Sequence, residues 1–309
     1  MKVIVAGGSG SLGRRLCADL SARGHEVVVL TRSPGPGPRR QLRWDGRTLG
    51  AWADELAGAA VINLAGELVD RRPTPANIEL LNTSRVQPTA ALATAAAALD
   101  APVPVWIQAS TLAIYGDAGE ALITEASPLA DGPPQMAGVA RAWEAAAEGV
   151  HAQRQVVLRT SIALDRGTPA MNRLSFLVRA GLGGRIGPGS QWFSWIHIED
   201  WLAVVRWALE GPGGASTGNP AAPPAQGVVL ATGPTPVRNA ELMATLRQVL
   251  HRPPAPPTPV PLVRLGALLL RTDPALPLTG RRAVPARLSE AGFTFRHPDL
   301  RMTLNDLLG

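Results

Sequence analysis

The chain has 309 residues, 46% hydrophobic and 17% charged, enough to bury the core of one large domain or two smaller ones. The single Cys17 excludes an internal disulfide and any cysteine-based zinc site. The net charge of +6 comes from scattered arginines without interleaved aromatic residues, which argues against a nucleic-acid partner. No run reaches the roughly 18 apolar residues of a membrane span. We therefore expect a cytoplasmic protein with no membrane partner.

The first half of the chain alternates strand and helix patterns. Apolar residues at helical spacing predict helices near 12–24, 75–99 and 136–151. Short apolar runs rich in β-branched residues predict strands at 2–6, 25–30, 60–64, 103–108 and 156–159. Strands that alternate with helices form a parallel sheet covered on both faces. The predicted fold is α/β, a Rossmann-type doubly wound parallel sheet with a smaller substrate-side lobe.

After residue 165 the pattern changes. The predicted elements are a helix at 169–180, a strand at 193–198, a helix at 199–210, a returning strand at 227–231 and a helix at 239–250 capped by Asn239. A proline-rich connector at 252–261 leads into a small helical tail. We expect residues 1–165 plus 199–233 to form the nucleotide-binding domain, and residues 166–198 plus 234–309 to form the lobe.

A glycine-rich turn separates the first strand from the first helix. Gly7, Gly10 and Gly13 give the spacing Gly-x-x-Gly-x-x-Gly. In this strand–turn–helix context, backbone amides at the helix start, those of Ser11 and Leu12 included, can meet a pyrophosphate with no Cβ in the way. An ordinary tight turn is the alternative. The context predicts a dinucleotide cofactor.

The end of the second strand distinguishes NAD from NADP. An NAD site places Asp or Glu there, roughly 20 residues after the glycines, to bind the ribose 2′-hydroxyl. Here that position reads Leu30-Thr31-Arg32, and Glu26 lies at the wrong end of the strand. A guanidinium suits the 2′-phosphate of NADP, although Arg32 could also be a solvated loop residue. We predict NADP(H).

Several further motifs, taken together, are similar to one family. They are Trp44-Asp45-Gly46, Asn63-Leu64-Ala65-Gly66-Glu67, Ser84-Arg85-Val86, Ala109-Ser110-Thr111, Tyr115-Gly116-Asp117, Arg141-Ala142-Trp143-Glu144, Trp192-Phe193-Ser194-Trp195-Ile196-His197 and Val284-Pro285-Ala286-Arg287-Leu288. The chain resembles extended short-chain dehydrogenase/reductases, in the branch of epimerase family proteins with an additional C-terminal segment. The resemblance implies that Asp45 contacts the adenine amino group and that Leu64, Ala65 and Gly66 line the cofactor. It implies no established reaction.

The usual catalytic pair of that fold is missing. Its Tyr-x-x-x-Lys motif lowers the tyrosine pKa so that it moves a proton near neutral pH. The corresponding positions hold Met136 and Ala140, and the chain contains one lysine, Lys2, and one tyrosine, Tyr115. No other alignment restores the pair, because Lys2 lies on the first strand.

Three residues could take over the proton chemistry. Tyr115 and Thr111 follow the fifth strand, at the sheet edge where ligands bind in such folds, and Glu67 follows the fourth strand. Tyr115 could donate a proton, Thr111 could hold a carbonyl or hydroxyl, and Glu67 could act as a base. Each has a structural alternative: loop packing for Tyr115, a strand-end contact for Thr111 and a surface position for Glu67.

Four residues are candidate substrate contacts: Arg85, Trp192, Trp195 and His197. Arg85 could bind a substrate anion or pair with Glu67, and core packing or a structural histidine are the alternatives for the others. The remaining histidines are too dispersed along the chain to suggest a metal.

Two functions remain open at this point. The protein could be an NADP-dependent oxidoreductase acting on an unidentified small carbonyl or hydroxyl compound, with no Tyr–Lys pair. Alternatively, it could bind NADP(H) without turnover, as a sensor or regulatory module. A homodimer is compatible with either function.

Overall fold

The structure is a computed structural model that describes residues 1–211 and 224–309. Its centre is a seven-stranded sheet with the strand order β11-β7-β5-β4-β1-β2-β3. Every neighbouring pair in this sheet is parallel. The strands are β1 (Lys2–Ala6), β2 (Glu26–Thr31), β3 (Arg40–Arg43), β4 (Ala60–Asn63), β5 (Trp106–Thr111), β7 (Gln155–Thr160) and β11 (Gly227–Ala231).

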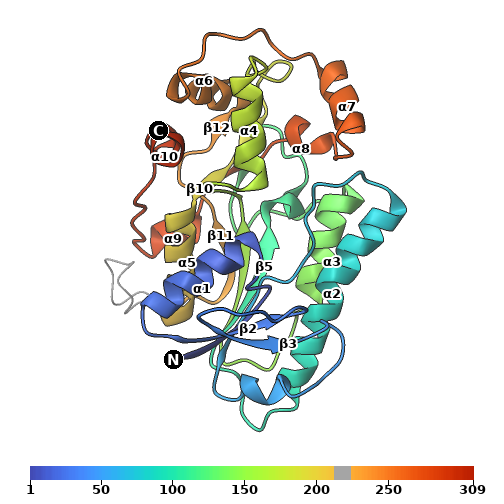
Figure 1. Ribbon diagram of the computed structural model, residues 1–309, viewed down its shortest axis with the longest axis vertical. Coiled ribbons are helices and arrows are strands. Elements are labelled where there is room, and N and C mark those ends of the chain that lie inside the picture. Colours follow the sequence, from blue (N-terminus) through green and yellow to red (C-terminus); the bar gives the residue numbers. More distant parts are fainter. Residues whose placement is uncertain (212–223) are drawn as a thin grey trace.

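Helices cover both faces of the sheet (Figure 1). One face packs on α1 (Ser11–Ala22) and α5 (Ile198–Glu210), and the other packs on α2 (Pro75–Ala97) and α3 (Val139–Ala145). The alternation along β1 explains the two layers, because Val3 and Val5 enter one core while Ile4 and Ala6 enter the other. The predicted doubly wound fold is confirmed.

A smaller group of elements lies beyond the carboxyl edge of the sheet, in the upper part of Figure 1. A separate core holds α4, α6 and α10 together. The helices are α4 (Pro169–Arg179), α6 (Asn239–Val249), α7 (Val260–Leu269), α8 (Ala275–Leu278) and α10 (Leu300–Leu308). Three two-stranded sheets accompany them: β8 (Ile162–Leu164) with β10 (Trp195–His197), β9 (Trp192–Phe193) with β12 (Val237–Arg238), and β6 (Leu122–Ile123) with β13 (Arg282–Ala283).

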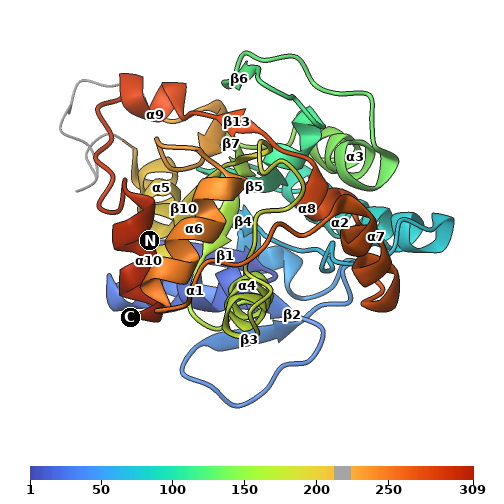
Figure 2. The ribbon, with the colours of Figure 1, turned by 90° about the horizontal axis from the view of Figure 1, so that it is seen from above.

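Seen from above, these elements lie over the edge at which the sheet strands end (Figure 2). One C-terminal segment belongs elsewhere, because Leu288 of α9 (Ala286–Glu290) and Phe293 pack in the core of the main sheet beside α5. The division of the chain into residues 1–165 plus 199–233 and the remainder stays a prediction. Among the described residues, no helix combines the length and apolarity that a bilayer span requires.

Several local features of the structure differ from the predictions. Strand β3 was not predicted, because it is short, partly exposed and preceded by a Pro/Gly-rich loop. The helix predicted over 136–151 begins as a π-helical turn, η3 (Pro134–Gly138), and ends at Ala145. The strand predicted at 193–198 is interrupted at Ser194, where the chain changes partners from β12 to β8. Asn239 is the first residue of α6 and not its cap, and its Oδ1 accepts from Ile186 N.

Candidate cofactor and active site

The turn between β1 and α1 has no room for side chains. Gly7 has a φ of +78°, and a Cβ there would lie 2.7 Å from Leu64 O. A Cβ on Gly13 would lie 2.3 Å from Gly7 O, inside the contact distance of the two backbones. Glycine therefore lets the helix start approach both the turn and the neighbouring β4 loop. The result is a bare backbone surface at the carboxyl edge of β1.

The start of α1 leaves its first amide groups available. Its N-cap, Gly10, has no side chain to accept a hydrogen bond, and the first turn contains no acidic residue. The first hydrogen bond of the helix runs from Arg14 N to Gly10 O, at 2.9 Å. The N–H groups of Ser11, Leu12 and Gly13 precede that bond and point out of the helix end. This uncapped positive end fits a phosphate group.

Arg32 and Glu67 lie opposite each other across the edge of the sheet. Arg32 Nη2 is 3.3 Å from Glu67 Oε1, and the Arg32 side chain is 78% exposed. The second carboxylate oxygen of Glu67 pairs with Arg71 at 3.2 Å. Arg32 is thus an exposed surface cation at the end of β2, and its solvent-screened ion pair with Glu67 is weak enough for a stronger anion to replace. Each carboxylate oxygen of Glu67 thus contacts one guanidinium, and the role of Glu67 as a base stays a prediction.

Asp45 shapes the turn that follows β3. Its Oδ1 accepts from Arg47 N at 2.8 Å and from Thr48 N at 2.9 Å, and its Oδ2 accepts from the Thr48 hydroxyl. These bonds to Thr48 and Arg47 lower the pKa of Asp45 to about 2. The carboxylate is exposed and ionised. Its contact with an adenine stays a prediction.

The loop after β4 is held from below by a buried polar network. Ala65 N donates to Asn63 Oδ1, and Asn63 Nδ2 donates to Thr89 Oγ1 at 2.8 Å. Gly66 packs so tightly on Arg85 that a Cβ would lie 3.0 Å from its Cζ. The sequence Leu64-Ala65-Gly66 therefore forms a fixed backbone wall beside the glycine turn.

Arg85 packs against this wall from inside the protein, and its contact with a substrate stays a prediction. It is buried, it donates from Nη2 to Glu67 O at 2.8 Å, and its guanidinium lies 5.0 Å from the Trp143 ring centroid. Burial lowers the pKa of Arg85 to about 10. The contact is with the main-chain carbonyl of Glu67. The predicted pairing with the Glu67 carboxylate is therefore wrong, because both carboxylate oxygens face Arg32 and Arg71.

Tyr115 is a core residue in this structure. It is 4% exposed, it donates to Thr124 O at 3.2 Å, and its oxygen accepts from Arg159 Nη1 at 2.7 Å. Burial raises the pKa of Tyr115. Arg159 also forms a two-pronged ion pair with Glu144. Sequence reasoning missed the roles of Arg159 and Glu144, since no local pattern connects them with Tyr115.

Thr111 lies half-buried at the end of β5, and its hydroxyl accepts a hydrogen bond but donates none within the described structure. Oγ1 accepts from Ala113 N at 3.2 Å and caps the short helix η2 (Leu112–Tyr115). Among the described residues, its O–H donates no hydrogen bond. Met136 in η3 and Ala140 in α3 occupy the positions of the family's Tyr and Lys. Neither side chain can donate or accept a proton, so they do not replace that catalytic pair.

The two tryptophans proposed as substrate contacts already pack against other residues of the protein. Trp195 is 1% exposed and donates from Nε1 to Thr235 O at 3.0 Å, so it packs in the lobe and lines no open surface. The Trp192 ring lies under two guanidinium groups, with centroid distances of 4.0 Å to Arg238 and 4.7 Å to Arg282. The substrate role predicted for Trp195 is contradicted by its burial, and Trp192 already stacks on cations.

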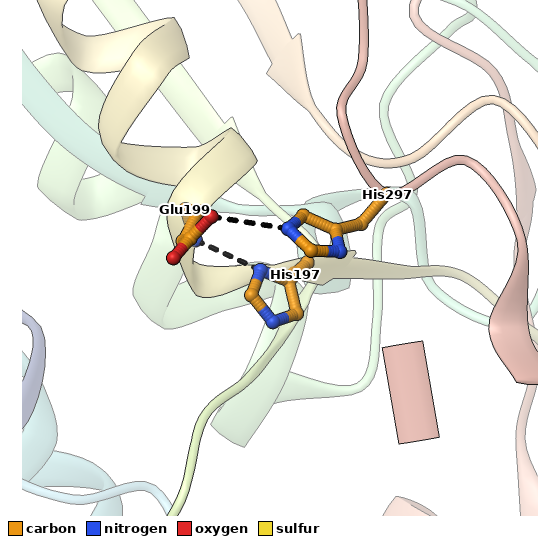
Figure 3. A group of neighbouring side chains, drawn as sticks. All are labelled: His197, Glu199 and His297. Carbon is orange, nitrogen blue, oxygen red and sulfur yellow. Dashed lines mark hydrogen bonds and ion pairs between the residues drawn. The ribbon is translucent and has the colours of Figure 1, made fainter. Parts of the chain in front are cut away.

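His197 forms the cluster shown in Figure 3 with Glu199 and His297. Its Nδ1 accepts from Glu199 N at 3.1 Å and caps α5, while its Nε2 lies 3.2 Å from Asp306. The His197 and His297 rings stack with centroids 3.7 Å apart, a proximity that sequence separation hid. Because Nδ1 is committed to the helix cap, it is unavailable to a cation. His197 thus links the C-terminal segment to α5 through Asp306 and His297, and its substrate role stays a prediction.

Comparison with known proteins gives the family. Residues 3–219 match the profile of the NAD dependent epimerase/dehydratase family, and residues 258–307 match a domain of unknown function, DUF1731. The chain is 33% identical over 318 residues to epimerase family protein SDR39U1 of Homo sapiens, with 100% of each chain covered. It is 30% identical over 321 residues to epimerase family protein YfhF of Bacillus subtilis, with 100% of this chain and 98% of that protein covered.

The structures agree with the sequence match. Human SDR39U1, crystallised with NADPH, superposes with a TM-score of 0.83 at 32% identity, covering 99% of both chains. A nucleoside-diphosphate sugar epimerase from Corynebacterium glutamicum gives a TM-score of 0.75 at 30% identity, covering 100% of this chain and 58% of that one. The bare glycine turn, the wall after β4 and the C-terminal segment agree with these matches, and the chain belongs to the NAD dependent epimerase/dehydratase family, in the group with a C-terminal DUF1731 segment.

Proposed function

We propose that this protein binds NADPH and reduces or oxidises a small carbonyl or hydroxyl compound. The observation that carries the proposal is the uncapped start of α1 beside a turn in which Gly7 and Gly13 leave no space for a Cβ. The exposed guanidinium of Arg32 at the end of β2 supports NADPH over NADH, because a 2′-phosphate can replace Glu67 as its partner. The NADPH in the human relative supports the same choice.

Thr111 is the best-placed side chain for the substrate oxygen. Within the described part of the chain its O–H has no acceptor, and its oxygen is held at the end of β5 by the bond from Ala113 N. Bound NADPH would supply a hydride to the carbonyl carbon. Thr111 would hold the carbonyl oxygen, and solvent would supply the proton that completes the alcohol. This assignment uses no Tyr–Lys pair.

Binding without turnover is a second candidate, favoured by a specific observation. The two ionisable groups predicted for proton transfer are both engaged: Tyr115 with Arg159 and Thr124, and Glu67 with Arg32 and Arg71. A protein of this kind would change its affinity for a partner on binding NADPH. Both candidate functions require NADPH binding, but only the oxidoreductase consumes NADPH.

One experiment separates these candidates. Calorimetry with NADPH and NADH first establishes binding, and nicotinamide absorbance then follows consumption across a panel of aldehydes and ketones. The oxidoreductase proposal expects turnover that falls roughly tenfold or more in Thr111→Val, with NADPH affinity unchanged. Tight NADPH binding with no consumption across the panel would favour the sensor. Absence of NADPH binding would overturn both.

Two attributes stay predictions for this chain. A cytoplasmic location is one, and an Arabidopsis thaliana relative that is 30% identical over 324 residues is described as chloroplastic. The homodimer is the other. The substrate itself is defined only by the small carbonyl or hydroxyl class proposed above.

A further inference from the structure

One short helix of the lobe, α7, presents leucines to solvent. Its exposed apolar side chains, 51% to 74% exposed, are Leu262, Leu265, Leu268, Leu269 and the C-cap Leu270. The other exposed large apolar side chains of the described residues are scattered along the chain. Single apolar residues on a surface are ordinary, whereas a contiguous exposed group marks an interaction site. The outer side of α7 is therefore a candidate docking surface.

The helical spacing gathers these leucines on one face. Leu262, Leu265 and Leu269 follow the pattern i, i+3, i+7, and Leu268 lies beside Leu265 on the same side. Within α7, only the small Ala267 is fully buried. A helix that serves a core buries its large apolar side chains, and α7 exposes them instead. Both views of the molecule show α7 at its outer edge (Figures 1 and 2).

Hydrogen bonds fix α7 to the rest of the protein near both of its ends. Before the helix, Thr258 N donates to Arg185 O at 2.8 Å. At its C-terminal end, the Arg72 guanidinium donates to Leu268 O. The carbonyl side of the last turn is thus bonded to the loop that follows β4. These contacts hold the helix in place while its leucines face outward.

The charges on α7 and its flanks are positive. Residues 242–272 contain four arginines and a histidine but no carboxylate. Arg264 on α7 and Arg271 after it are both exposed, and neither forms an ion pair among the described residues. Asp70 already has an ion-pair partner on α4 at 2.7 Å, and Asp273 is buried. The leucine face is therefore bordered by arginines that lack a counter-charge.

We propose that the outer face of α7 docks on an anionic lipid surface. The leucines enter the boundary between headgroups and acyl chains, and Arg264, one helical turn before Leu268, meets lipid phosphates together with Arg271. The contact is peripheral, because the ten residues of α7 are too few to span a bilayer. A second copy of this chain suits the face less well, since pairing two α7 helices brings their arginines together with no carboxylate on either helix.

The test is co-sedimentation of the whole protein with phosphatidylcholine vesicles that contain or lack phosphatidylglycerol as the anionic lipid. We expect wild type to bind the anionic vesicles, and the affinity to fall roughly tenfold or more in the double variant Leu265→Asn/Leu269→Asn. Leu49→Asn is the matched control, because Leu49 lies beyond β3 and is 52% exposed, against 51% for Leu265. It should stay within about twofold of wild type.

A second pair of variants tests the charges. Arg264→Gln/Arg271→Gln should lower the preference for anionic over neutral vesicles roughly tenfold, and high salt should weaken wild-type binding. Arg23→Gln/Arg301→Gln removes the same charge from two exposed positions outside α7 and should keep the preference. Thermal midpoints equal to that of wild type verify that the variants fold, since every side chain replaced is exposed.

Several results would overturn the proposal. They are no binding of wild type to the anionic vesicles, equal binding to neutral and anionic vesicles, and wild-type affinity in the leucine double variant. A leucine-dependent dimer in sedimentation velocity without vesicle binding would assign the face to a second copy and contradict the lipid surface. None of these measurements involves NADPH, so the proposed function and the docking surface stand or fall separately.

Discussion

Arg159 donates from Nη1 to the phenol oxygen of Tyr115 over 2.7 Å, inside the core. The Nε and Nη2 of the same guanidinium donate to the two carboxylate oxygens of Glu144. Ser110 adds a hydroxyl bond to that carboxylate. The network joins β5, β7, α3 and η2, the elements that end around the candidate active site. The one tyrosine of the chain thus serves the scaffold that positions Thr111.

Replacing Tyr115 by Phe should lower stability and leave NADPH affinity unchanged. The substitution leaves Arg159 Nη1 without its acceptor in the core, at a cost of about 1–3 kcal/mol in the free energy of unfolding. Urea unfolding and calorimetry measure the two quantities. A turnover rate lowered roughly a hundredfold with unchanged stability would instead make Tyr115 the proton donor.

Replacing Arg32 by Ala should remove the preference for NADPH over NADH. The guanidinium supplies a charged partner to the 2′-phosphate and nothing to the 2′-hydroxyl, so NADPH affinity should fall roughly tenfold to a hundredfold while NADH affinity stays. Competition titrations with both cofactors give the ratio. Glu67→Gln is the matched control, since it frees Arg32 from its ion pair and should keep or raise NADPH affinity. An unchanged ratio in Arg32→Ala would assign the 2′-phosphate to another group.

Replacing Gly13 by Ala should damage both fold and cofactor site. The new Cβ would lie 2.3 Å from Gly7 O, so α1 must move away from the turn, at a cost of about 3 kcal/mol or more. Gly138→Ala is the control, because Gly138 is helical and its Cβ would have 3.9 Å of space. That control should be neutral or stabilising by up to about 1 kcal/mol. Thermal unfolding and NADPH binding test the pair; equal behaviour would mean that the turn is not constrained.

Lowering the pH should weaken the fold through His197. Burial and the stacked His297 lower the pKa of His197, so the unfolded chain binds a proton that the folded chain resists. The free energy of unfolding should therefore fall as pH drops below about 6.5, the ordinary histidine value, until the lower folded pKa is reached. His197→Asn keeps a side-chain acceptor for the α5 cap and should flatten this dependence. Unfolding midpoints across that pH interval check it, and equal slopes in both proteins would exclude His197 as the cause.

Local patterns in the sequence were sufficient to predict the central sheet and the glycine-rich turn of the protein. Alternating strand and helix patterns specified the parallel sheet, and the glycine spacing specified a turn that no Cβ can enter. Composition alone excluded the Tyr–Lys pair, because one lysine on β1 cannot reach the helix after β5. These features depend on residues close together in the chain, where backbone geometry and side-chain periodicity act directly.

Only the tertiary structure decided which side chains are free to act. Tyr115 and Arg159 lie 44 positions apart, and no local sequence pattern around either residue predicts the hydrogen bond between them. The rings of His197 and His297 lie 100 positions apart in the chain and stack for the same reason. Packing fixes such pairings by bringing distant elements together. The sequence therefore determined which side chains were candidates for binding the cofactor and the substrate. Long-range contacts determined which of these side chains already have hydrogen-bond or packing partners inside the protein.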